Sequence, residues 1–275
     1  MIEGSDIGPI FAVEPGAEPY PALMNRGAIA DMAAIEPTVV LVKGDLTSHG
    51  TEEEYQSFLA AYGPAFGDRL RYVRGNHDAY HGATFGSDAP FEIGLPGARL
   101  AVLDTTLPGR PSGQLTTDSL EWLDELAARS DDRPLLVFGH HHPWNPGSPK
   151  RNLDYFGINP DDSERLVALV ARRRAITGYF AGHTHRNRVR RFAATGPVPW
   201  VEVACVKDFP GTWAEYRVFD RGVLQIHRRI SSPDALAWSE RTKAMYAGLY
   251  FGYAFGALDD RCFAILPREG TPGGR

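Results

Sequence analysis

The chain has few of the features that mark specialised classes of protein. Two cysteines in 275 residues, Cys205 and Cys262, are too few for a disulfide framework and favour a reducing compartment such as the cytoplasm. The 29 Lys and Arg do not exceed the 34 Asp and Glu, so the net charge of −5 gives no signal of nucleic-acid binding. The start, Met1 to Asp6, has neither a basic nor an apolar stretch, so we expect no signal peptide.

Long hydrophobic runs are also lacking. The longest run without Asp, Glu, Lys, Arg or His, 244–258, is shorter than the roughly 20 residues of a transmembrane helix. We expect this aromatic segment to pack on the core or against a second copy in a homodimer, with peripheral membrane contact as the weaker alternative. Hydrophobic residues at 43% and charged residues at 23% are the proportions of an ordinary globular protein.

Strand and helix patterns alternate through most of the chain. Short apolar runs predict strands at 38–43, 69–74, 99–104, 135–138 and 175–181. Helices are expected at 22–35 and from Thr51, Thr117 and Asp161 or Ser163. Further strands follow at 188–192, 198–205, 216–220 and 223–230, before a last helix near Pro233. This order predicts an α/β fold of layered mixed sheets flanked by helices, with one domain over 1–230 and a C-terminal helical and aromatic extension over 231–275.

Histidines are clustered in this sequence. Six of its nine histidines fall in short clusters, and each cluster follows a predicted strand. The strand-end motifs are Gly44-Asp45, Gly75-Asn76-His77-Asp78, Gly139-His140-His141-His142-Pro143 and Gly182-His183-Thr184-His185. Because ligands of open α/β sheets bind beyond the carboxyl ends of the strands, we expect these motifs to converge. Carboxylate, amide and imidazole donors without a thiolate suit Mn, Fe, Zn, Co or Ni.

In this order the four motifs resemble those of the calcineurin-like metallophosphoesterases. The resemblance covers residues 36–230 and is greatest to the branch of cyclic-nucleotide and glycerophosphodiester phosphodiesterases. It implies a hydrolase with a dinuclear metal centre, in which a metal-bridging hydroxide attacks phosphorus in line. By resemblance, Asp45 bridges two divalent ions, such as manganese and iron, and His185 ligates one of them. Asn76, His141 and His183 complete the other metal site, and His77 contacts the phosphoryl group or protonates the leaving oxygen.

One motif of the family has no counterpart before Asp45. The family's pattern opens with Asp-x-His at the end of a first strand, whereas Asp6-Ile7-Gly8 has glycine in place of the histidine. We expect that first strand to be absent from this sequence because the true start lies upstream. The alternative is a natural variant that binds one metal ion, or a non-catalytic metal- or nucleotide-binding module on the same scaffold.

Several other residues have less certain roles. Within the triplet, His140 is the alternative ligand to His141, and His142 is expected at the pocket wall. Asp78 either orients a neighbour or is a plain turn acid. Arg186 is the candidate contact to substrate phosphate, although a solvated strand face would also explain Arg186, Arg188 and Arg190. The loop 144–159 is a candidate substrate wall, and His49, His81 and His227 are expected to be structural or exposed. The substrate is expected to be a small phosphoester, with cyclic nucleotides among the candidates.

Overall fold

The computed structural model describes residues 10, 14–82, 85–129 and 131–268, so Asp6 lies outside the described residues. The helices are α2 (Tyr20–Ala33), α3 (Glu52–Phe66), α4 (Asn76–Ala79), α5 (Thr117–Ala128), α6 (Pro160–Arg172), α7 (Pro233–Thr242) and α8 (Tyr250–Phe255). The strands are β1 (Val40–Lys43), β2 (Leu70–Val73), β3 (Phe91–Leu95), β4 (Ala98–Val102), β5 (Leu135–Phe138), β6 (Ile176–Ala181), β7 (Arg188–Arg190), β8 (Trp200–Glu202), β9 (Thr212–Phe219), β10 (Gly222–Arg229) and β11 (Phe263–Ile265).

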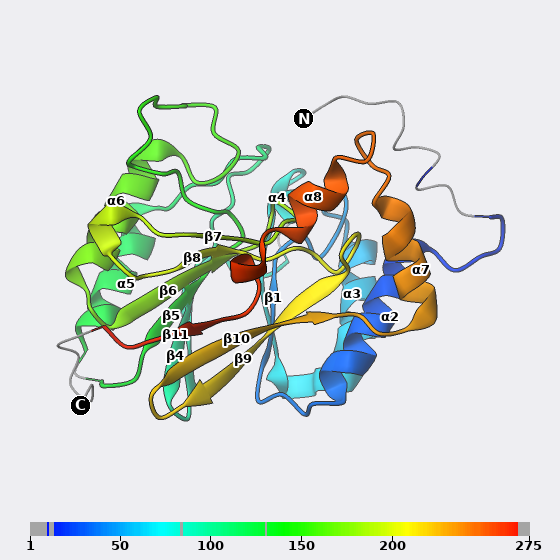
Figure 1. Cartoon of the computed structure of the whole chain (residues 1–275), viewed down its shortest axis with the longest axis horizontal. Helices are drawn as coiled ribbons and strands as arrows, with labels where there is room; N and C mark the ends of the chain where they lie inside the picture. Colours follow the sequence, from blue (N-terminus) through cyan, green and yellow to red (C-terminus); the bar gives the residue numbers. More distant parts are fainter. Residues whose placement is uncertain (1–9, 11–13, 83–84, 130, 269–275) are drawn as a thin grey trace.

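These strands form three sheets (Figure 1). The largest has the order β3-β4-β5-β6-β8-β7, in which β4, β5, β6 and β8 are parallel and the edge strands are antiparallel. Strands β1 and β2 form a parallel pair, and β11-β10-β9 form an antiparallel sheet. Because β11 pairs with β10, part of the C-terminal extension is built into a sheet.

Among the described residues the sheets and helices are stacked in layers around three large hydrophobic clusters, and a fourth, smaller cluster packs α8 against Phe209. One cluster packs α5 and α6 on one face of the six-stranded sheet. A second joins the opposite face of that sheet to β1, β2 and β9–β11. The third packs α2, α3 and α7 over the outer face of β1 and β2. The predicted α/β sandwich of mixed sheets flanked by helices is therefore confirmed.

The apolar part of strand β1, Val40–Val42, contributes to two hydrophobic clusters. Successive side chains of a strand point to opposite faces, so both faces of a central strand need apolar residues. Val40 and Val42 face the helices α2 and α3, whereas Leu41 faces the six-stranded sheet. This double burial holds the segment after Lys43, where Asp45 lies, in a fixed position.

Helix starts follow the expected capping chemistry, with small shifts. Thr51 caps α3 by accepting a hydrogen bond from the Glu54 amide, as predicted. The cap of α5 is Thr116 and not Thr117, and Asn159 caps α6 one residue before Pro160. Sequence patterns did not predict β3, α8 or β11.

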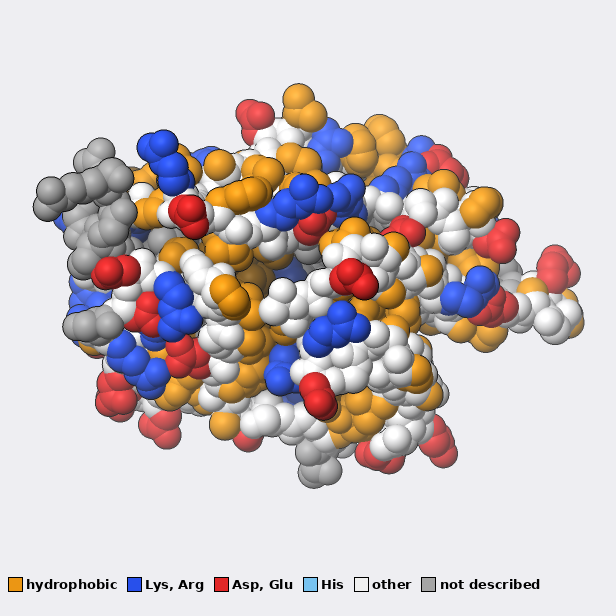
Figure 2. All heavy atoms as spheres, turned by 90° about the horizontal axis from the view of Figure 1, so that it is seen from below, with side chains coloured by type: hydrophobic (Ala, Val, Ile, Leu, Met, Phe, Trp, Pro, Cys, Tyr) orange, Lys and Arg blue, Asp and Glu red, His pale blue; other side chains and the backbone are white. Residues whose placement is uncertain are grey.

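The surface agrees with the balanced composition. On the face seen in Figure 2, Lys and Arg are interspersed with Asp and Glu and do not form one basic patch. Among the described residues, no helix is long and apolar enough to span a bilayer.

Candidate metal centre

The first two motifs meet where β1 and β2 end side by side. Lys43 pairs with Val73 in this parallel register, so Asp45 and Asn76 follow at the same edge. The Asp45 carboxylate accepts a hydrogen bond of 3.1 Å from the His77 amide. Gly75 makes this approach possible, because a Cβ atom there would lie 2.2 Å from Asp45 Oδ1.

Asp78 connects these two loops through hydrogen bonds. Its buried carboxylate accepts hydrogen bonds from the Leu46, Thr47 and Gly75 amides and from the Thr47 hydroxyl, at 2.7–3.1 Å. These hydrogen bonds favour the ionised carboxylate, but burial has the larger effect and raises the pKa of Asp78. Of the two interpretations, the structure favours an orienting residue over a plain turn acid.

Within the histidine triplet, His140 is the side chain that lies beside Asp45 and Asn76. Its Nδ1 donates a 2.7 Å hydrogen bond to the Lys43 carbonyl, so Nε2 presents its lone pair when the ring is neutral. Nε2 lies 3.0 Å from Asn76 Oδ1 and 3.4 Å from Asp45 Oδ1. A backbone carbonyl behind the ring and oxygens in front are the surroundings of a metal-binding imidazole.

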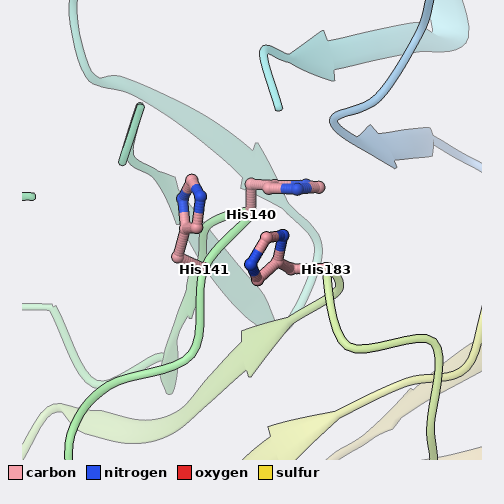
Figure 3. Close-up of side chains that lie close together, drawn as sticks. All are labelled: His140, His141 and His183. Atoms are coloured by element: carbon pink, nitrogen blue, oxygen red, sulfur yellow. The ribbon is translucent and has the colours of Figure 1, made fainter. Parts of the chain in front are cut away.

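His183 and His141 complete a buried group with His140, as Figure 3 shows. One ligand nitrogen from each of the three rings lies within 4.8 Å of the others. Nε2 of His141 and Nε2 of His183 are buried with no hydrogen-bond partner among the described residues. Burial lowers the pKa of both histidines, so the rings are neutral near pH 7. Neutral imidazoles with orphaned nitrogens next to a carboxylate fit a divalent cation.

His141 also has a different environment from His140. Its Nδ1 lies 2.8 Å from the Thr105 hydroxyl, and its ring packs against Gly113. His142 is buried beside Tyr155, with ring centroids 5.1 Å apart.

Three candidate ligands have a strained backbone. Asp45, His183 and His185 have φ angles of 54°, 65° and 54°, in the left-handed region that non-glycine residues rarely adopt. Such conformations persist where the surrounding structure holds them, and they cluster at functional sites.

His185 turns toward residues that the motifs did not include. Its Nδ1 lies 3.3 Å from Asp208 Oδ2, and Cys205 Sγ lies 3.0 Å from Asp208 Oδ1. Although burial opposes protonation, the charges of Cys205 and Asp208 raise the pKa of His185. Cys205 and Asp208 could have been predicted from their position, because both follow the end of β8 at the edge of the sheet where the other motifs lie.

His77 is half-buried at the rim of the group. Its Nδ1 lies 2.8 Å from the Ser48 carbonyl, which leaves Nε2 for another partner. The outer histidine His49 is exposed and pairs with Glu54. Part of the loop 144–159 lies against the centre, since the Phe156 ring stacks on His183 with a centroid distance of 4.0 Å.

The arginines after His185 surround one buried carboxylate. Arg186 lies 2.9 Å from Glu202, and Arg190 and Arg188 lie 3.5 and 3.9 Å from it. The Arg190 side chain is only 10% exposed, so this is not a fully solvated strand face. The Arg186 charge is partly compensated by Glu202.

Comparison with known proteins shows the family of the chain. Residues 5–187 match the calcineurin-like phosphoesterase family, so the chain belongs to that family. It is 32% identical over 170 residues to "Glycerophosphodiester phosphodiesterase GpdQ" of Enterobacter lignolyticus, covering 57% of this chain and 59% of that protein. It is also 32% identical over 181 residues to "3',5'-cyclic adenosine monophosphate phosphodiesterase CpdA" of Pseudomonas aeruginosa, covering 63% of each. The chain thus spans about three fifths of these curated relatives.

Solved structures show the same fold. A dimetal phosphatase from Danio rerio superposes with a TM-score of 0.60 at 14% identity, covering 90% of this chain and 89% of that one. The purple acid phosphatase PPD1 of yellow lupin gives 0.55 at 15% identity, covering 80% of this chain and 50% of that one. The family resemblance inferred from the motifs, including its branch, is confirmed.

Proposed function

We propose that the chain is a metal-dependent phosphodiesterase. The observation that carries the proposal is the group formed by Asp45, Asn76, His140 and His183 at the carboxyl ends of β1, β2, β5 and β6. One carboxylate, one amide oxygen and two imidazoles form a donor set for a divalent ion, and Nε2 of His183 is buried without a hydrogen-bond partner among the described residues.

Two groups of residues have donor atoms that suit a bound metal ion. Asp45, Asn76, His140 and His183 would hold one ion, and His185 would join a second ion. His140 takes the place of His141, which the motif favoured, because His140 lies beside Asp45 and Asn76, and His141 is the alternative ligand. Bound divalent ions would supply a water molecule of lowered pKa and would neutralise charge on the phosphoryl oxygens. Manganese, iron, zinc, cobalt and nickel all suit these donors. A single bound ion is the alternative stoichiometry.

His77 is the proposed proton donor to the leaving oxygen. The Ser48 carbonyl holds its Nδ1, so Nε2 is the atom that can transfer the proton. The Asp45 carboxylate accepts a hydrogen bond from the His77 amide, and this bond would position the His77 backbone next to the metal-binding group.

The proposed substrate is a small phosphodiester such as a cyclic nucleotide. The curated relatives named for cyclic-nucleotide and glycerophosphodiester hydrolysis support this class. Phe156 on His183 provides an apolar wall next to the centre, and Arg186 stays a predicted phosphate contact. A cytoplasmic location is also proposed, because both cysteines are free.

The test is hydrolysis of 3',5'-cyclic AMP and bis(p-nitrophenyl) phosphate with added Mn²⁺. His77→Ala should lower kcat by about 10²-fold or more, as expected when a general acid is removed. His140→Ala should abolish both turnover and tight manganese binding, whereas the control His49→Ala, on the exposed surface, should retain both. The assay should use two proteins, the chain of 275 residues and a longer chain that includes any upstream coding sequence.

Two outcomes would contradict the proposal. Inactivity of both proteins with several metals and substrates would favour a non-catalytic metal- or nucleotide-binding module, which binds one ion at most. Full activity of His140→Ala together with loss of activity in His141→Ala would assign the ligand to His141 and overturn our choice within the triplet.

A further inference from the structure

A second cluster of metal-binding side chains lies beside the first. His185 follows β6, and Cys205 and Asp208 follow β8, which is the parallel neighbour of β6. The ligand atoms of the three side chains all lie within 4.8 Å of one another. The turn 182–185 links this cluster to the first, because His183 belongs to one and His185 to the other.

The separations are close to those of a tetrahedral metal site, although each of the two shortest distances involves a different oxygen of Asp208. Zinc binds sulfur at about 2.3 Å and nitrogen or oxygen at about 2.0–2.2 Å, so neighbouring ligand atoms lie roughly 3.3–3.8 Å apart. His185 Nδ1 to Asp208 Oδ2 is 3.3 Å, and Cys205 Sγ to Asp208 Oδ1 is 3.0 Å. A rearrangement of a few tenths of an ångström would bring all three to bonding distance.

We propose that His185, Cys205 and Asp208 bind a divalent ion that prefers a thiolate ligand, with zinc as the type. Cysteine, histidine and aspartate together are a zinc-type ligand set, and three protein ligands leave a position for solvent, as in open zinc sites. The His185 side chain is 30% exposed, which provides access to solvent. This thiolate distinguishes the cluster from the oxygen and nitrogen donors of the first group.

Charge balance at the cluster supports a cation. Lys207 Nζ lies 3.2 Å from Asp208 Oδ2, and the Tyr250 hydroxyl donates to Asp208 Oδ1. When His185 is neutral, as a metal ligand must be, a Cys205 thiolate and the Asp208 carboxylate carry two negative charges, and Lys207 compensates one of them. Because the ligands must be a thiolate and a neutral imidazole, metal binding should release to solvent the protons that Cys205 and His185 carry.

Cobalt(II) is the probe, because only a thiolate ligand gives a sulfur-to-cobalt charge-transfer absorption band. The apo protein is titrated with Co²⁺ alone and then with Zn²⁺ in competition. Cys205→Ser should remove the charge-transfer band and weaken zinc binding at the cluster at least about tenfold. Asp208→Asn should weaken binding in the same direction. Cys262→Ser is the matched control, because Cys262 is exposed, and it should keep the band.

Three results would overturn the site. These are cobalt binding without a charge-transfer band in the unmodified protein, a band that survives Cys205→Ser, or a band lost in Cys262→Ser. The first would leave the cluster as a hydrogen-bonded ion-pair network around Asp208. Circular dichroism of each variant distinguishes loss of the ligand from loss of the fold. The spectra are recorded without substrate, so failure of this site and failure of phosphodiester hydrolysis are separate outcomes.

Discussion

Gly75 is the position where one added methyl group should disable the metal centre. Its φ and ψ of −108° and 179° are allowed for alanine, so Gly75→Ala adds no backbone strain of its own. The new Cβ atom would lie 2.2 Å from Asp45 Oδ1, 2.3 Å from the Asp45 amide nitrogen and 2.8 Å from His140 Cε1. The effect of the substitution is therefore purely steric.

The size of the expected effect depends on the atoms that the new Cβ atom would contact. Normal contacts of a carbon atom are about 3.5 Å, so the loops that carry Asp45 and Asn76 must separate by about 1 Å. Overpacking costs typically 1–3 kcal/mol, and we expect about 3 kcal/mol because the obstacle includes a main-chain atom. A shift of this size exceeds the roughly 0.2 Å tolerance of metal–ligand distances, so manganese affinity should fall at least about tenfold.

Urea denaturation in the presence of a chelator measures the free energy of unfolding, and calorimetric titration with Mn²⁺ measures the manganese affinity. Gly252→Ala is the matched control, because Gly252 lies in α8 and a Cβ atom added there would have no other atom within 4 Å. It should be neutral or stabilising by up to about 1 kcal/mol. A loss below about 1 kcal/mol in Gly75→Ala, with unchanged manganese affinity, would refute the close packing of Asp45 against Gly75.

Two further predictions concern charges. Glu202→Gln should destabilise the fold by about 3 kcal/mol in urea denaturation, because it leaves the largely buried Arg186 and Arg190 without their carboxylate. The exposed pair partner Glu164 is its control, and an equal loss in Glu164→Gln would contradict this reasoning. The hydrogen bond from Arg173 lowers the pKa of Asp124 to about 2 from 3.8, so its stabilisation is present above pH 4 and is lost as the pH falls toward 2. Asp124→Asn should cost about 1 kcal/mol at pH 7 after allowance for solvent screening, and a difference from wild type that persists unchanged at pH 2 would be evidence against it.

Local sequence was sufficient for most of the elements and for the location of the chemistry. The apolar run that forms β1 and the Thr51 cap of α3 depend on neighbours in the chain, so their patterns could be interpreted directly. Strand β3, which pairs with the next strand β4, was not predicted, and helix α8 is short and packs against Phe209, which is distant in sequence. Strand β11 owes its place to pairing with β10, about 40 residues earlier.

The sequence by itself determined which residues are candidates for the chemistry: Asp45, Asn76 and the histidines lie in motifs that each follow a strand end, and those signals are local. Only the tertiary structure decided which ring of the triplet meets Asp45, because consecutive side chains point in different directions and the pairing of β5 with its neighbours sets their rotation. The same is true of His185 with Cys205 and Asp208. Some 20 residues separate them along the chain, and they come together because β8 pairs with β6.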